Sequence, residues 1–317
     1  MNTLKWSGNA VFLPSEQYGS RRFCHLNMMA QDAGTTVFSR AVGDSSNSLS
    51  RHIQFAFEPY DQALAGFASA IVRDQYDEGF ETAVPSFLNM MASTIVAEER
   101  FVYELCVGRS VDSQQIEGFA FRPVLVPGGR VVRLGKWVAQ VLPVRVSKRV
   151  GSGRLRMLEP SSTFVFAEPR NWHRRLRVAR RVSRMYDQLE GVERSRFLEA
   201  SDKSGLPSNY MDGHKSRLRM LAKAVAPLGW NRGGTFRDFI TDYQVLEWAI
   251  RWAEFCTDLG NTIIGELQRA VSRIAALIGS QSRLVVRELG NRTRGRGLRE
   301  RLRKGQVSMS EVLDSVV

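Results

Sequence analysis

Four carboxylates in the stretch DQYDEGFE have the type and the spacing that could hold a divalent metal ion. Asp74, Asp77, Glu78 and Glu81 are separated by intervals that place them on one face of a helix. Carboxylate oxygens are the ligands that Mg²⁺ prefers, and Mg²⁺-dependent nucleases use them. Gly79 interrupts the helix, however, and no acidic strand end with a lysine accompanies the group. We therefore expect either a solvated acidic face or the partner of a basic surface on a neighbouring subunit.

The remaining candidates for catalysis or cofactor binding each lack a residue that their motif requires. GGRVVRLGKW (128–137) is one residue too long for a phosphate loop, and Trp137 stands where a serine or threonine must ligate magnesium. GSGR (151–154) lacks the third glycine of a dinucleotide fingerprint and is a turn. No histidine has a partner at metal-ligand spacing; the four are His25, His52, His173 and His214. We expect no catalytic residue, no metal and no cofactor, hence not an enzyme.

The most distinctive charged stretch is RNWHRRLRVARRVSR (170–184), which carries seven arginines in fifteen positions. Five of them follow a 4-3-4-3 spacing, which confines them to roughly an 80° arc of a helix; these are Arg170, Arg174, Arg177, Arg181 and Arg184. The opposite face is expected to carry the apolar side chains Trp172, Leu176, Val178, Val182, Met185, Tyr186 and Leu189. Like charges at i, i+4 repel one another, so an anionic partner is expected to offset the repulsion.

Composition supports an anionic partner for the whole chain. The 317 residues carry a net charge of +13 and an isoelectric point near 10.2, which favours contact with nucleic acid or another polyanion. The tail adds further basic residues, among them Arg292, Arg294 and Arg296. Without a base-reading module, such charge predicts salt-sensitive contact with phosphates that is independent of sequence.

The cysteines and the hydropathy pattern indicate where the protein works. Cys24, Cys106 and Cys256 are odd in number and far apart, which argues for a reducing compartment and against a disulfide framework. No run of eighteen apolar residues exists, so we expect no membrane span. The start of the chain has no signal-peptide pattern. These features predict an intracellular protein, or one assembled inside a cell.

The first half of the chain changes from helical to strand-rich patterning. Residues 1–57 are expected to form an irregular arm with a short strand, and residues 58–100 a helical segment whose second helix begins at Pro85. Residues 101–168 contain short alternating strands broken by Pro-Gly-Gly (127–129) and by Pro143. They predict a small antiparallel β-rich module inserted between helices.

The second half is predicted to be helical throughout. Residues 169–279 form a stem-like region in which the arginine helix opens after Pro169, a second helix spans 214–230, and a third spans 236–278 with Thr235 as its cap and Asp238 completing a capping box. An unbroken helix over 236–278 would be roughly 65 Å long; the alternative is two helices broken near Gly260. Residues 280–317 form a basic helical tail with Ser308 or Ser310 as a cap. The fold class expected is α+β, mainly helical.

The order of these pieces resembles the portal (head–tail connector) proteins of tailed bacteriophages over about residues 80–315. The resemblance lies in AEERFVYELCVG, LVPGGRVVRLGKWVAQVLP and RMLEPSSTFVFAEP, which resemble the strands around the clip domain of that family, and in GWNRGGTFRDFITDYQVLEWAIRW and LRKGQVSMSEVLDS near the end. Ala97-Glu98-Glu99 stands where the family usually has a glycine before the aromatic residue.

The resemblance implies a function for the whole chain. A portal is a homo-oligomeric ring at one capsid vertex, through which double-stranded DNA passes during packaging and ejection. The packaging ATPase docks on its clip and the head–tail neck proteins dock afterwards. The protein would then belong to the virion, assembled in the host cytoplasm. The arginine stripe would contact either DNA phosphates or the acidic face of the adjacent subunit.

Two other hypotheses are consistent with the sequence. The chain could be a non-catalytic, sequence-independent nucleic-acid-binding protein of a cell or mobile element, located in the cytoplasm. It could also be a metal nuclease that uses the carboxylates at 74–81. Oligomeric state separates a ring from a simple nucleic-acid-binding protein, and Mg²⁺-dependent cleavage of DNA would identify the nuclease.

Overall fold

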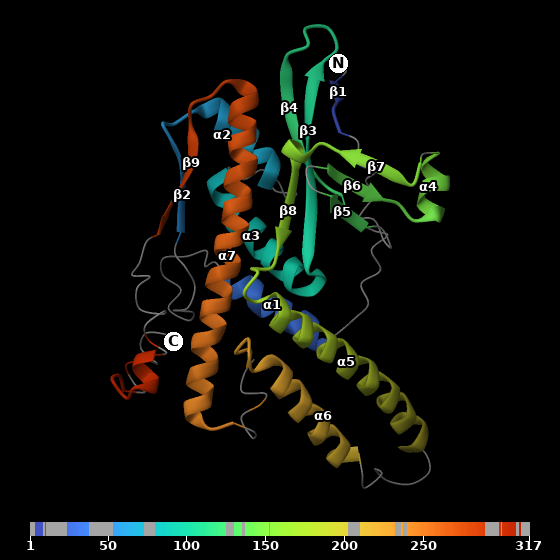
Figure 1. Ribbon diagram of the computed structural model, residues 1–317, viewed down its shortest axis with the longest axis vertical. Helices are drawn as coiled ribbons and strands as arrows, with labels where there is room; N and C mark the ends of the chain where they lie inside the picture. The colour runs from blue at the N-terminus through green and yellow to red at the C-terminus, as the bar shows by residue number, and fades with distance from the viewer. Residues whose placement is uncertain are drawn as a thin grey trace.

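The protein is a mainly helical α+β fold, as the sequence predicts, with seven helices longer than one turn among the residues described (Figure 1). The computed structural model describes residues 4–8, 10, 24–37, 53–72, 80–124, 130–134, 137–151, 153–201, 210–231, 236, 240–288, 298, 300–308 and 311. Every strand pair in these ranges is antiparallel.

The longest element is α7 (Asp242–Ile278), a continuous helix of 37 residues. At 1.5 Å per residue it is about 55 Å long, and it runs most of the height of the molecule (Figure 1). Gly260 is buried within it without a break, so the two-helix alternative is wrong. The predicted cap residues Thr235 and Asp238 lie outside the described residues; the helix starts at Asp242 because Thr241 and Gln244 form a reciprocal capping box.

The N-terminal arm contains a helix that the sequence analysis did not expect. The predicted short strand is present as β1 (Leu4–Trp6), but α1 (Cys24–Val37) follows where an irregular chain was expected. Leu26, Met29 and Ala33 are buried at helical spacing. Gly34 faces α3 so closely that a Cβ would lie 2.1 Å from the Ser93 hydroxyl, which explains a glycine in a helix that packs tightly.

Helices α2 (Gln62–Val72) and α3 (Phe80–Glu98) form the expected helical segment. Helix α3 begins at Phe80 and not at Pro85, which lies inside it. Its buried residues Leu88, Met91 and Ile95 contribute to the main core, which α1 and α7 share. Asp61 caps α2, because its carboxylate accepts hydrogen bonds from the backbone N–H groups of Ala63 and Leu64 at 2.9 and 3.0 Å.

Two strands far apart in sequence form a separate ribbon beside α7. Strand β2 (Ile53–Glu58) pairs with β9 (Arg283–Glu288). The prediction of an irregular chain up to residue 57 and of a purely helical tail after 280 is therefore wrong here. Phe55, Phe57 and Leu284 are buried, so the alternation of apolar residues in both segments decides their conformation.

The β-rich region divides into two sheets. The larger sheet joins β1, β3 (Arg100–Ser110) and β4 (Ile116–Pro123) in that order, and β8 (Thr163–Ala167) pairs with the other part of β3. It packs on the helices through a cluster of aromatic rings, in which Tyr103 stacks on Phe121 at 4.5 Å between centroids. Phe164 and Phe166 of β8 are completely buried in this cluster.

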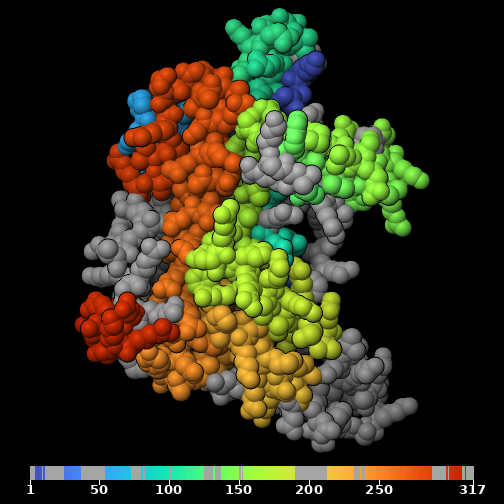
Figure 2. Space-filling view, viewed as in Figure 1, coloured from blue at the N-terminus to red at the C-terminus, as the bar shows by residue number. Residues whose placement is uncertain are grey.

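The smaller sheet has the order β5 (Arg130–Leu134), β6 (Trp137–Val141) and β7 (Leu155–Leu158). Between β6 and β7 lies α4 (Val144–Val150), a helix that the sequence analysis missed. With α4 this sheet forms a lobe that projects from the helical body (Figures 1 and 2). We call residues 130–158 the small lobe.

Helices α5 (His173–Ser201) and α6 (Tyr210–Val225) form a hairpin at the end of the molecule away from the β3–β4 hairpin (Figure 1). The predicted second helix, 214–230, thus begins and ends a few residues earlier.

The described end of the chain packs on the start of α7 through Leu298 and Leu302. Burial raises the pKa of Glu247 on α7, but hydrogen bonds from Arg303 and Arg251 outweigh it, so its pKa lies below the ordinary value. Ser308 accepts a hydrogen bond from the Glu311 N–H at 3.2 Å. Ser310, the alternative cap, lies outside the described residues.

Candidate functional site

The arginine stripe lies on α5 and the segment just before it. Of its five members, Arg170, Arg174, Arg177 and Arg181 are exposed, whereas Arg184 is half-buried. Arg177 donates to the His173 ring at 2.8 Å, and no carboxylate of the described residues pairs with any of the four exposed guanidinium groups. We call these four residues the arginine row. It offers four positive charges to a partner outside the subunit.

Two other arginines of the same stretch have internal roles. Arg184 donates to the backbone carbonyl of Ala97 at 2.8 Å, so it does not belong to the free stripe as predicted. Arg180 is 1% exposed and donates to the carbonyls of Val96 and Ile95 at 2.6 and 2.5 Å. Both cover the C-terminal end of α3, where unpaired carbonyls and the helix dipole favour positive charge.

A buried carboxylate balances Arg180. Glu168, whose side chain is 3% exposed, accepts a hydrogen bond from Arg180 at 2.7 Å and forms an ion pair with it. Its other oxygen bonds the Nδ1 atom of His173. Glu168, His173 and Arg177 therefore form a chain of hydrogen bonds from the interior to the arginine row, and this chain orients the Arg177 side chain.

The start of α5 is tied to the middle of α7. Asp258 accepts hydrogen bonds from the Asn171 amide at 2.9 Å and from the Trp172 indole N–H at 2.7 Å. Trp172 is buried against Phe255, and the Arg175 guanidinium lies 4.9 Å from the centre of its ring. The arginine row is thus mounted on a rigid junction of two helices.

The predicted apolar face of α5 is only partly correct. Trp172, Leu176 and Tyr186 are buried as expected. Val178, Met185 and Leu189 are exposed, although they were assigned to the same face. The buried face is rotated toward Ala179, Arg180, Ser183 and Asp187, because the side chain of Arg180 and the pairing of Asp187 with His25 at 2.7 Å occupy it.

Helix α6 adds basic residues that the sequence analysis left out. Lys215, Arg219 and Lys223 are exposed, and their i, i+4, i+8 spacing was the signal that could have identified them. The described side chains of the α5–α6 hairpin include a single carboxylate, Asp187, which is paired with His25.

Most of the other predicted site residues lie outside the described part of the chain. Asp74, Asp77 and Glu78 lie outside the described residues, as do Arg292, Arg294 and Arg296. Glu81 belongs to the first turn of α3. Within the described ranges, no group of three or more His, Cys, Asp and Glu side chains could hold a metal ion. No described helix is long and apolar enough to cross a membrane.

The two described cysteine thiols are poor nucleophiles. Burial, with a contribution from Glu104, raises the pKa of Cys106 to about 11. Burial, with a contribution from Asp32, raises the pKa of Cys256 well above its ordinary value. Because the thiolate is the reactive form, neither side chain is prepared for nucleophilic catalysis.

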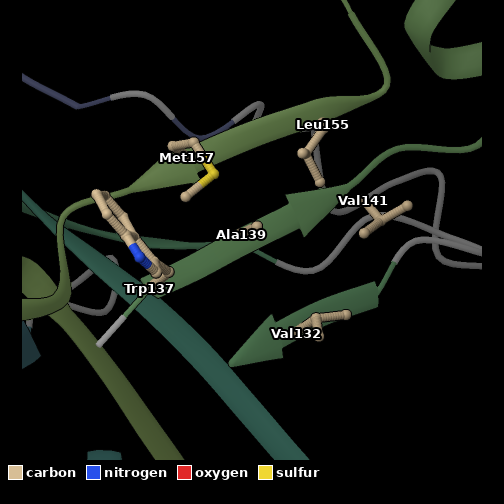
Figure 3. Close-up of a pocket in the computed structure, with 6 residues that line it drawn as sticks. All are labelled: Val132, Trp137, Ala139, Val141, Leu155 and Met157. Atoms are coloured by element: carbon tan, nitrogen blue, oxygen red, sulfur yellow. The ribbon is translucent and has the colours of Figure 1, made fainter. Parts of the chain in front are cut away.

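A second surface stands out on the small lobe. Its outer sheet face forms a hollow of about 650 Å³ lined by six apolar residues, Val132, Trp137, Ala139, Val141, Leu155 and Met157 (Figure 3). The register places Val132, Ala139 and Met157 in one row across the three strands. Trp137 is 56% exposed and Leu155 is 60% exposed. Apolar residues lie on both faces of this sheet, and those of the inner face are buried.

Comparison with protein families finds no match for this chain, and comparison with curated proteins finds none either.

Proposed function

We propose that the protein is a non-enzymatic, portal-type ring subunit through which double-stranded DNA passes, and that the arginine row faces the DNA backbone. The resemblance over residues 80–315 supplies the type of assembly. The packaging ATPase, the neck proteins and a place in the virion belong to the same proposal. What supports contact with DNA is the arginine row itself.

The charge balance of α5 is the observation that carries the proposal. Arg180 and Arg184 are used inside the subunit, where carbonyls and Glu168 hold them. Arg170, Arg174, Arg177 and Arg181 are exposed, with no carboxylate of the described residues paired to them. Arg174, Arg177 and Arg181 extend about 10 Å along α5, and Arg170 lies just before the helix. Such a row suits a phosphate backbone, which is contacted without reading the bases.

Binding to a DNA duplex at several salt concentrations tests the arginine row. The triple variant Arg174→Gln, Arg177→Gln, Arg181→Gln should bind more weakly, and the slope of log K against log salt should fall by about 2 to 3, since each lost phosphate contact removes about 0.9. The matched control neutralises three exposed basic residues of α4, Arg145, Lys148 and Arg149. This control lowers the net charge equally and should leave most of the slope intact.

The two triple variants also give the results that would contradict contact between the arginine row and DNA. An equal slope for wild type and the α5 variant would assign the arginine row to subunit contacts. Equal losses in both variants would show that total charge matters and position does not. Light scattering tests the ring separately: a particle many times the 35.8 kDa of one chain is expected. A monomer that still binds DNA would favour the simpler nucleic-acid-binding protein.

A further inference from the structure

The outer sheet face of the small lobe has the composition of a protein interior. On the inner face, Val131, Val138 and Leu158 are buried against Val102 of the larger sheet and Val124, which follows β4. Gln140, also on that side, is completely buried and donates to the Val124 carbonyl at 2.6 Å. The described apolar residues of the inner face are therefore packed on the body, and the lobe does not need its outer face to fold against it. An apolar face that is open to solvent marks an interaction site.

The side chains that form the hollow come from all three strands. Met157 points toward the Trp137 ring at one end, and Leu155 and Val141 lie at the other end (Figure 3). Exposure of Met157 reaches 42% and that of Val132 37%. Beyond Val141, the first residue of α4, Val144, is also apolar and is 47% exposed.

The charge around this face has one sign. The chain carries no acidic residue between Glu117 and Glu159, and the small lobe alone carries eight basic ones, namely Arg130, Arg133, Lys136, Arg145, Lys148, Arg149, Arg154 and Arg156. Helix α4 joins the end of β6 to the start of β7, so it lies at the Val141–Leu155 end of the sheet, and its basic residues Arg145, Lys148 and Arg149 are exposed. No carboxylate of the described residues pairs with Arg145, Lys148, Arg149 or Arg154.

Shape and charge together select among possible occupants. A second copy of the same face would bring basic borders together, which like-charge repulsion disfavours. A bilayer is broad and level, whereas this face is hollowed. A nucleic acid requires polar groups or several stacking rings, and the hollow offers one ring, that of Trp137, among aliphatic and thioether side chains. A helix with an apolar side and acidic flanks satisfies both features, because it fills the hollow and pairs with α4.

We propose that the outer face of the small lobe is a docking site for an acidic amphipathic helix of a different protein. The apolar side of that helix occupies the hollow over Val132, Trp137, Leu155 and Met157. Its carboxylates pair with the exposed basic residues of α4. The proposal concerns a surface separate from the arginine row, and it stands whether or not the protein forms a ring around DNA.

The test uses two labelled synthetic helices of about five turns each, with leucine on one side and either glutamate or lysine on the other. Fluorescence anisotropy with the full chain should show the glutamate peptide binding at least about tenfold more tightly than the lysine peptide. Met157→Asp should weaken binding of the glutamate peptide by about tenfold or more. The matched control is Met185→Asp on α5, because both methionines are 42% exposed; it should change binding less than about twofold.

Further variants separate docking from misfolding and from other partners. Leu155→Asp, on the same strand as Met157, should reproduce the loss, and circular dichroism should show both variants folded. Neutralising Arg145, Lys148 and Arg149 should weaken the glutamate peptide and reduce its salt dependence, whereas neutralising Arg174, Arg177 and Arg181 should not. This second comparison distinguishes failure here from failure of the DNA-binding proposal.

Several results would overturn the docking site. No binding of the glutamate peptide at about 1 mM would do so, since that corresponds to less than about 4 kcal/mol. Equal binding of the lysine peptide, or equal effects of the Met157 and Met185 variants, would also count against it. Vesicles of phosphatidylcholine and phosphatidylglycerol and a single-stranded oligonucleotide are the competing probes. Tighter, Met157-dependent binding of either one would assign the face to that partner instead.

Discussion

Replacing Arg180 with alanine should destabilise the protein far more than any substitution in the arginine row. The side chain is 1% exposed, pairs with the buried Glu168 at 2.7 Å and donates to two carbonyls at the end of α3. Removing one partner of a buried ion pair costs about 3–5 kcal/mol, because the other charge stays buried without compensation. Since whole domains are stable by about 5–15 kcal/mol, this is a large fraction of the total.

Urea unfolding followed by circular dichroism measures the effect. A loss of about 4 kcal/mol should lower the midpoint by about 1 to 2 M, given slopes of about 2 to 3 kcal/mol per M. Arg181→Ala is the control, since Arg181 is adjacent and exposed; it should change stability by less than about 0.5 kcal/mol. Equal midpoints for the two variants would refute the assignment of Arg180 as a buried structural charge.

A double variant separates the two contributions of Arg180. Glu168→Gln with Arg180→Met removes the buried charge of both partners, and such replacements are often close to neutral. The double variant should therefore be more stable than Arg180→Ala. If it is equally unstable, the loss comes from the carbonyls of Ile95 and Val96 and from repacking, and the ion pair contributes little.

Three other predictions concern single positions elsewhere. Hydrogen bonds from the Ser280 hydroxyl and then from the N–H groups of α2 lower the pKa of Asp61 below its ordinary value of 3.8. The difference in unfolding free energy between wild type and Asp61→Asn should therefore be constant above about pH 5 and disappear as the pH falls below that value. Urea unfolding at several pH values measures this difference. With its pKa near 11, the Cys106 thiol should resist alkylation of the native protein at pH 8, where only about 0.1% is thiolate; rapid labelling of Cys106 would contradict this. Gly229→Ala should lower the free energy of unfolding by at least about 2 kcal/mol in thermal unfolding, because φ is +81° and a Cβ would lie 2.0 Å from a carbonyl oxygen of α7. The control Gly265→Ala, where a Cβ would meet open space, should leave stability unchanged or raise it.

Helical periodicity predicted the large elements well because their apolar residues recur without interruption. Helix α7 shows an unbroken register from Leu246 to Ile274, and Gly260 was too weak a breaker to overcome it. Helix α1 was missed for the opposite reason: Gly34 and the two threonines that follow it indicate a turn. Only the close approach to α3 explains why a glycine is favourable there.

The candidate surfaces were predictable to different degrees. Spacing alone located three exposed arginines on α5 and Arg170 just before it. It could not show that Arg180 and Arg184 cover the end of α3, because tertiary packing brings that end to α5. The hollow of the small lobe was not expected at all. Alternation in WVAQV and LRML places apolar residues on both faces, and the sequence does not reveal that only one face is covered.

Helix α7 joins parts of the chain that are otherwise remote. It packs against α1, α2, α3, β8 and β9, and Asp258 on it holds the start of α5. Because α7 contacts all of these elements, we expect them to unfold together in one cooperative transition. Fragments cut within residues 242–278 should not fold separately.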